Sequence, residues 1–296
     1  MATSAMTERK PYPSDLSDAR WALIGPKLQA WQQARIDRRP TGQPATIDLR
    51  DVFNAILYIN RTGIAWKYLP HDFPPHTTVY YYFGLWRDEG IFQQLNLDLA
   101  GLVRIKEGRD PQPTAAILDT QSIKTSTNVP AADQGIDAAK KIVGRKRGIL
   151  TDTLGIILAV IVCSASLTDN NIGIKLLNQA KTAYPTISKV WVDTGFKTKA
   201  VEHGATLGID VEVVPRNTQV KGFSVVKRRW VVERSFGWLM FHRRLARDYE
   251  THPSSSKSMI QIGMIDNLAK RATDETRGCP GSRRSWKVAV PHLSPA

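Results

Sequence analysis

Residues 115–124 read AAILDTQSIK, and this stretch sets the class of fold. Four apolar residues from Ala115 to Leu118 indicate a buried strand, and Asp119 follows at its expected end. Further short apolar runs, each expected to be a strand, lie at 148–151, 156–162, 187–192 and 211–214. Helices are expected from Asp169 to Ala180 and near 197–207. Two crossovers of the strand-helix-strand type after an antiparallel start predict a mixed α/β sheet with flanking helices.

The chain upstream of this sheet has helical periodicity. Three helices are expected, around residues 21–28, 49–57 and 79–86. Pro26 should kink or stop the first helix, whereas Asp48 should cap the second and Gly63 should end it. Short helices joined by Gly and Pro turns are typical of a helix-turn-helix module, and also of a plain packed bundle. We therefore expect a helical, helix-turn-helix-like DNA-recognition region over residues 1–110.

The charge of the chain is large and unevenly placed. The 296 residues carry 41 basic and 27 acidic side chains, a net charge of +14, which favours a polyanionic partner. Residues 216–250 alone hold nine basic and three acidic side chains. One basic cluster lies on a long helix expected from Val225 to Arg247, and comprises Lys227, Arg228, Arg229, Arg234, Arg243, Arg244 and Arg247. A second, expected as a loop before the strand at 148–151, comprises Lys140, Lys141, Arg145, Lys146 and Arg147. Each cluster is either a track for phosphates or a solvated face.

Several classes of protein are excluded. No apolar run is long enough to cross a membrane, and residues 1–15 lack the apolar segment of a secretory signal. Cys163 and Cys279 are too far apart for a zinc knuckle or a disulfide framework, so a reducing cytoplasmic compartment is expected. Residues 111–271 should form the sheet-containing domain, and residues 272–296, rich in Gly, Pro, Ser and Arg, a disordered basic tail.

Three carboxylates have surroundings that point to metal chemistry. Asp119 and Asp193, in KVWVDTGF (189–196), each follow an apolar strand, and the carboxyl ends of strands are where open sheets bind ligands. Glu233, in KRRWVVERSFGWL (227–239), is an isolated acid on the basic helix. Carboxylates brought together repel unless a cation lies between them, and oxygen ligands favour Mg²⁺ or Mn²⁺. Taken singly, the aspartates are equally typical of turns and the glutamate of a solvated helix face.

Four strings carry a family resemblance. They are 49–90 (LRDVFNAILYINRTGIAWKYLPHDFPPHTTVYYYFGLWRDEG), 117–125 (ILDTQSIKT), 190–196 (VWVDTGF) and 228–250 (RRWVVERSFGWLMFHRRLARDYE). Together with shorter strings between residues 12 and 271, they resemble the bacterial DDE-type insertion-sequence transposases of the IS-four/IS-five superfamily. The most specific feature is an Arg four residues before the catalytic Glu, here Arg229 before Glu233.

The resemblance implies a ribonuclease-H-like core in which Asp119, Asp193 and Glu233 are the catalytic residues and hold two Mg²⁺ ions, with Mn²⁺ as a substitute. It implies cutting of DNA at the terminal inverted repeats of an element, and attack of the freed 3′-hydroxyl on target DNA. A bacterial cytoplasmic, nucleoid-associated protein that is at least a dimer in the complex of two DNA ends is expected.

The chain also departs from the family pattern. Thr194, Gly195 and Phe196 replace the usual residues after the second Asp, and Val226, Met240 and Gly148 stand where relatives have Tyr, a basic residue and His. These departures keep two rivals open: a metal-dependent nuclease that does not join strands, and a non-catalytic transposase-derived DNA-binding protein. Trp230 and Trp238, which flank Glu233, are read as core residues or as a platform for a flipped base.

Overall fold

The computed structural model describes residues 9–38, 47–215 and 229–275. Four helices come first: α1 (Asp18–Arg38), α2 (Leu49–Thr62), α3 (His76–Asp88) and α4 (Ile91–Lys106). The predicted ends of α2 are confirmed, because the Asp48 side chain accepts a hydrogen bond from the backbone N–H of Arg50 and Gly63 adopts φ 81°. The predicted stop at Pro26 is wrong, since α1 continues through this residue and buries Ile24, Leu28 and other side chains. The fourth helix, α4, was not predicted.

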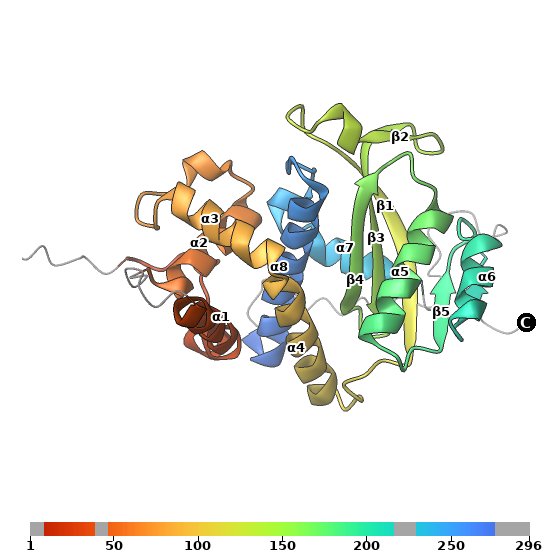
Figure 1. Cartoon of the computed structure of the whole chain (residues 1–296), viewed down its shortest axis with the longest axis horizontal. Coiled ribbons are helices and arrows are strands. Elements are labelled where there is room, and N and C mark those ends of the chain that lie inside the picture. Colours follow the sequence, from red (N-terminus) through yellow and green to blue (C-terminus); the bar gives the residue numbers. More distant parts are fainter. Residues whose placement is uncertain (1–8, 39–46, 216–228, 276–296) are drawn as a thin grey trace, which may run out of the picture.

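A mixed sheet of six strands follows, and the prediction of an α/β fold is confirmed (Figure 1). The strands are β1 (Ala115–Lys124), β2 (Gly135–Asp137), β3 (Ile142–Asp152), β4 (Ile157–Ser164), β5 (Lys189–Val192) and β6 (Asp210–Val213). Strand β3 pairs antiparallel with β1, β2 and β4, whereas β5 lies parallel to both β1 and β6. Strand β1 is therefore central, with an antiparallel neighbour on one side and a parallel neighbour on the other.

Helices cover the sheet on both faces. They are α5 (Asp169–Ala183) and α6 (Lys199–Thr206), which connect the parallel strands, followed by α7 (Trp230–Leu239) and α8 (Pro253–Ala272). Helix α5 packs on β3 and β4, and α7 packs on β1 and β3. Short 3-10 turns occur at η1 (Trp66–Tyr68), η2 (Ala131–Asp133) and η3 (Arg243–Leu245). Among the helices of the described ranges, none is long and apolar enough to cross a membrane.

Two expected boundaries are wrong. Strand β1 does not end at Asp119 but continues to Lys124, because β3 is long enough to pair with it up to Gly144. The long helix expected from Val225 to Arg247 is also shorter: α7 ends at Leu239, and residues 225–228 lie outside the described residues. The chain then turns through η3, so the basic residues beyond 240 do not share a helix with Glu233.

Helix α8 joins the two parts of the molecule. It packs against α4, α2 and α3 on one side and against β4 on the other (Figure 1). Its apolar residues, among them Met259, Ile260 and Leu268, are completely buried, and they belong to one continuous core that includes both the first helices and the sheet. This helix was not predicted. Residues 276–296, most of the predicted basic tail, lie outside the described residues.

Candidate active site

The pairing of β1 with β5 brings two aspartates together. The two strands run parallel, and Ile117 is in register with Trp191. Continuing this register by two residues places Asp119 beside Asp193, which directly follows β5. Each carboxylate accepts one backbone hydrogen bond, Asp119 from the N–H of Thr120 (2.7 Å) and Asp193 from the N–H of Gly195 (2.8 Å). The sheet itself therefore fixes the spacing of the two acids.

A guanidinium group lies between the two aspartates. Arg229 directly precedes α7, and its Nη2 atom is 3.7 Å from Oδ2 of Asp193 and 4.0 Å from Oδ2 of Asp119. The Arg229 and Asp119 side chains are largely buried, with 13% and 15% of their surface exposed. A cation at this point offsets the repulsion between two carboxylates held at close range.

Asp119 is electrostatically perturbed. The pKa of its carboxyl is raised to about 6, chiefly by burial and in smaller part by the neighbouring Asp193. The Thr120 N–H and the positive charges of Arg229 and Lys140 lower the pKa, but they do not outweigh burial. A carboxyl with a raised pKa next to a like charge at the edge of a sheet is typical of functional sites.

Glu233 does not complete a cluster with these two residues. It lies on α7 one helical turn after Arg229, and its side chain is exposed. Among the residues that the structure describes, no three His, Cys, Asp or Glu side chains gather closely enough to hold a metal ion. The structure thus brings Asp119 and Asp193 together, with Arg229 rather than Glu233 as their immediate third partner. The two aspartates still fit a divalent cation, because they present oxygen ligands whose negative charge one guanidinium only partly balances.

A second polar network, which was not predicted from the sequence, links the strand that carries Asp119 to the start of α5. The hydroxyl of Thr120 donates to Oδ1 of Asp169 (2.8 Å), the first residue of α5, and Nζ of Lys146 lies 3.1 Å from the same oxygen. A Cβ atom on Gly195 would lie 2.9 Å from Asp193 Oδ1 and 3.0 Å from Asp169 Oδ2, so a side chain there would displace these carboxylates. The positions were marked in the sequence by Asp169 at a helix start and by the TG pair after Asp193.

Comparison with known protein families identifies the family to which the chain belongs. Residues 110–268 match the family "Transposase DDE domain", a span of more than half of the chain that contains Asp119, Asp193 and Glu233. The chain belongs to the DDE transposases. Residues 16–96 match a second family, "Putative transposase of IS4/5 family", which makes it a transposase of the IS4/IS5 type. The mixed sheet with its flanking helices is accordingly a ribonuclease-H-like domain.

Similarity to individual proteins is more distant. Among solved structures, the transposase resembles the Drosophila P element transposase in its strand transfer complex, with 14% sequence identity and a TM-score of 0.34. The alignment covers 88% of this chain and 66% of that chain, so the transposase spans just under two thirds of its relative. No curated protein matches the chain significantly.

Three residues of the second basic cluster are buried in the transposase rather than placed in a loop. Arg145, Lys146 and Arg147 lie in the centre of β3, with at most 6% of each residue exposed. Arg145 donates to the carbonyl oxygens of Glu250 (2.6 Å) and Thr251 (2.7 Å) and lies 3.4 Å from Asp248. Arg147 donates to the carbonyl of Leu245, and Lys146 to that of Leu167. The prediction that these three residues form a loop is wrong, and their partners leave them no place in a surface phosphate track.

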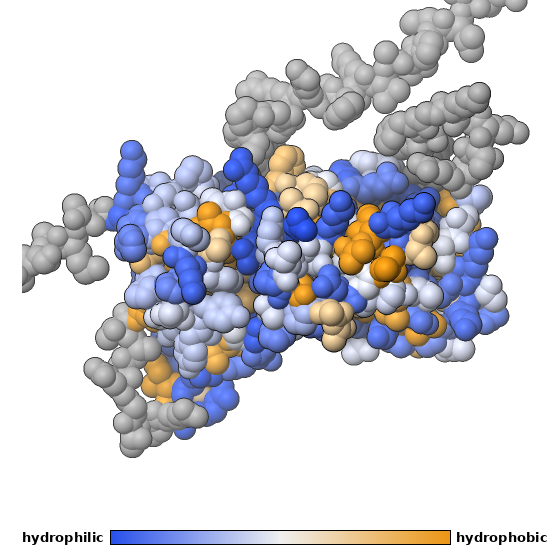
Figure 2. Space-filling view, turned by 90° about the horizontal axis from the view of Figure 1, so that it is seen from above, coloured by the Kyte–Doolittle hydropathy of each residue, from blue (hydrophilic) through white to orange (hydrophobic). Residues whose placement is uncertain are grey.

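The other predicted basic residues are divided between surface and interior. Arg244 is buried and pairs with Glu250 (2.7 Å), so it too is unsuited to a phosphate track. Lys140 and Lys141 lie exposed at the turn before β3, and Arg243 and Arg247 are exposed near η3. Lys227 and Arg228 lie outside the described residues, as does Val226. The surface seen in Figure 2 is largely hydrophilic, with apolar residues in separate patches.

Arg234 and two tryptophans form a stack on α7. The guanidinium of Arg234 lies 4.4 Å from the ring centre of Trp230 and 4.8 Å from that of Trp238, and it also donates to the carbonyl of Leu154. Trp230 retains 39% of its surface exposed, whereas Trp238 is half-buried. The two rings therefore sandwich an arginine, an arrangement that neither sequence interpretation anticipated.

One departure from the family pattern has a packing reason. Gly148, where relatives carry His, faces α5, and a Cβ atom there would lie 2.3 Å from Ile172. The transposase packs α5 closer to β3 than a side chain at this position would allow.

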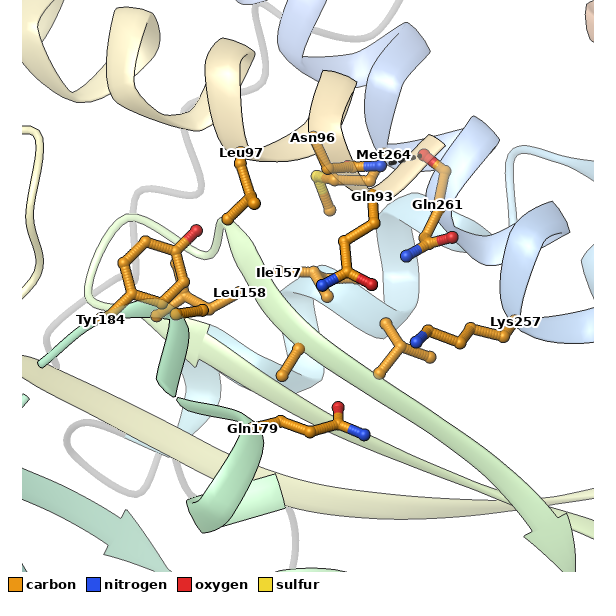
Figure 3. Close-up of a pocket in the computed structure, with 13 residues that line it drawn as sticks. Gln93, Asn96, Leu97, Ile157, Leu158, Gln179, Tyr184, Lys257, Gln261 and Met264 are labelled. Atoms are coloured by element: carbon orange, nitrogen blue, oxygen red, sulfur yellow. Dashed lines mark hydrogen bonds between the residues drawn. The ribbon is translucent and has the colours of Figure 1, made fainter. Parts of the chain in front are cut away.

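A hollow lies between α4, β4, α5 and α8 (Figure 3), and neither Asp119 nor Asp193 is among the residues that line it. Its walls carry the amides of Gln93, Asn96 and Gln261, and Asn96 donates to the carbonyl of Gln261 (3.1 Å). Lys257 reaches into it, and burial lowers the pKa of this amine. Since the hollow is narrow and the Asn96 amide bonds across it, it is a packing gap at the helix-sheet junction and not a candidate active site.

Proposed function

We propose that this transposase cuts DNA at the terminal inverted repeats of its own element and transfers the 3′-hydroxyl ends into target DNA. The observation that carries the proposal is the pair Asp119 and Asp193, which adjacent parallel strands deliver to one edge of the sheet beside Arg229. Membership of the DDE family supports a polynucleotidyl transferase chemistry for these acids.

Asp119 and Asp193 would hold the divalent cations, with Mg²⁺ preferred and Mn²⁺ as a substitute. When bound, such ions polarise the scissile phosphate and lower the pKa of the attacking hydroxyl. The rest of the chain positions these acids: the Thr120 and Gly195 N–H groups orient the two carboxylates, and Asp169 holds Thr120. We propose Glu233 as the third acidic ligand, because it follows Arg229 by one turn of a helix that packs on β1.

DNA binding would use the exposed cations near the sheet edge. Lys124, Lys141 and Arg247 line one shallow groove, and Lys140 is close enough to Asp119 for its charge to lower the pKa of that carboxyl. We propose that these residues, with Arg243, contact phosphates, and that two copies of the chain meet on paired element ends. Each phosphate contact would add to the salt dependence of binding.

The test is a cleavage and joining assay with Mg²⁺ on DNA that carries the element ends. Asp119→Ala, Asp193→Ala and Glu233→Gln should each abolish both reactions, whereas Glu202→Gln, an exposed carboxylate on α6, should leave them intact. Cleavage that survives Asp119→Ala would refute the site. Cleavage without joining would instead support the nuclease, and salt-sensitive binding without cleavage the non-catalytic DNA-binding protein.

A further inference from the structure

A second groove lies between the helical region and the chain that leads into α8. It has a volume of about 420 Å³, within the range of about 300–1,000 Å³ typical of ligand sites. One wall comes from η1 and the first turn of α3, and the other from residues 249–255. Asp119, Asp193 and Glu233 are not among its lining residues, so it is distinct from the candidate active site.

Aromatic side chains stand on both walls of this groove. On the helical side, the rings of Trp66 and Tyr80 pack edge to face with centres 5.0 Å apart, and Tyr80 remains 45% exposed. On the opposite side, Tyr249 is 36% exposed, and the guanidinium of Arg244 lies 5.4 Å from its ring centre. The groove thus presents accessible aromatic surface from two segments that are far apart in the sequence.

Buried and part-buried hydrogen bonds hold the two walls at a fixed separation. Arg244 donates through Nη1 to the carbonyl of Ile64, just before η1, and through Nε to Glu250 on the other wall. At the start of α8, Ser255 accepts a hydrogen bond from Arg87 of α3 (2.9 Å). Because these bonds cross between the walls, the groove is part of the folded core and does not depend on loop closure.

The charge of the lining suits an anion. Among the described residues that line the groove, Glu250 carries the only carboxylate, and Arg244 neutralises it. Lys67 adds a positive charge at the helical wall, and His76 and His252 add two imidazoles. Asn128, Thr77 and Thr251 supply hydrogen-bonding groups between the aromatic rings.

We propose that this groove binds one or two unpaired nucleotides of a DNA strand. The faces of aromatic rings bind the faces of bases, and in duplex DNA those faces are covered by stacking. The combination of exposed aromatic rings with the positive charge of Lys67 therefore fits single-stranded DNA better than a duplex, whose phosphates alone would be accessible. The inference rests on the proposed action on DNA, and it adds a place where a strand separated near the cleavage point is held.

The experiment uses the full chain with Asp119→Asn, so that binding is measured without cleavage. Fluorescence anisotropy gives the affinity for a labelled single-stranded oligonucleotide and for a duplex of the same sequence. Tyr80→Ala and Tyr249→Ala should each weaken single-strand binding about tenfold, in line with the loss of one base stack, and leave duplex binding within about twofold. Tyr80→Phe should bind the single strand as tightly as the Asp119→Asn parent chain, because the aromatic ring is kept.

Tyr68→Ala is the matched control, since Tyr68 lies in η1, is 79% exposed and does not line the groove. Equal losses for Tyr68→Ala and Tyr80→Ala, or equal losses on both forms of DNA, would overturn the groove assignment while leaving the proposed function intact. A chain that binds neither oligonucleotide would overturn the proposed function as well. Binding of a protein or a free nucleotide in place of single-stranded DNA would also count against the proposal.

Discussion

Two arginine-rich stretches of this transposase look alike in the sequence and differ completely in the fold. Arg145 and Arg147 lie in the middle of β3 and donate to backbone carbonyls of residues 245–251. Arg229 and Arg234 lie at α7, one beside the paired aspartates and the other between two tryptophans. The first stretch attaches a distant segment to the sheet, whereas in the second stretch Arg229 lies at the candidate active site.

A run of positive charge therefore does not by itself indicate a surface. A central strand is covered on both faces, so its arginines must find acceptors inside the protein. Here the acceptors are carbonyl groups about a hundred positions later in the chain, left unpaired because the chain makes a short 3-10 turn rather than a long helix. Three predictions test this contrast.

The largest expected effect belongs to Arg145. Arg145→Ala removes a fully buried guanidinium, so that Asp248 loses an ion pair and the carbonyls of Asp133, Glu250 and Thr251 lose a donor. The free energy of unfolding should fall by about 3–5 kcal/mol, as measured by urea denaturation monitored by circular dichroism. Lys140→Ala, on the exposed turn before β3, should change it by less than about 0.5 kcal/mol. Equal effects of the two substitutions would contradict the contrast.

The next largest effect is expected at His242, and it tests the burial of the segment whose Leu245 carbonyl accepts a hydrogen bond from Arg147. Burial lowers the pKa of His242, which directly precedes η3, to about 4. Between about pH 6.5 and pH 4, the native state therefore binds fewer protons at this site than the unfolded state, so stability should fall as the pH is lowered. The loss attributable to His242 should approach about 3 kcal/mol below pH 4. Denaturation at a series of pH values should show that the free energy of unfolding falls less steeply with decreasing pH in His242→Gln than in the wild type. The same pH dependence in both proteins would refute the lowered pKa of His242.

The smallest effect on stability is expected at Arg229. Arg229→Ala should reduce the free energy of unfolding by about 1 kcal/mol or less, because its contacts with the aspartates are 3.7–4.0 Å long and one partner is part-exposed. The substitution removes a positive charge that lowers the pKa of Asp119, so this pKa should rise above about 6. Carboxyl ¹³C NMR titration without added metal measures it, with Arg229→Lys as the charge-preserving control. An unchanged or lower pKa in Arg229→Ala would contradict the geometry.

Much of the fold follows from local patterns in the sequence. The apolar runs around 115–118 and 156–162 predict strands, and Asp48 and Gly63 predict the ends of α2, because capping and strand burial depend on neighbouring residues. Helix α8 was not predicted, because no local pattern marks it. It is buried on several sides, so it lacks the clear polar face that marks a surface helix.

The candidate site could be predicted only in part. Asp119 and Asp193 were identifiable because each follows a run of apolar residues, and parallel pairing of β1 with β5 then brings them together. The partners Thr120, Asp169 and Lys146 come from three separate elements, and their meeting depends on the register of β1 with β3 and on where α5 starts. No local pattern encodes such a register, so these contacts required the structure.

The position of α8 also affects how the protein can be made. The ribosome synthesises the first helices early, and α8, which covers their apolar faces, only after every strand of the sheet has been completed. Chains that stop before α8 would expose the uncovered faces of α2 and α4, and such surfaces invite aggregation or degradation. A prematurely terminated product would therefore aggregate or be degraded instead of persisting as a free helical fragment.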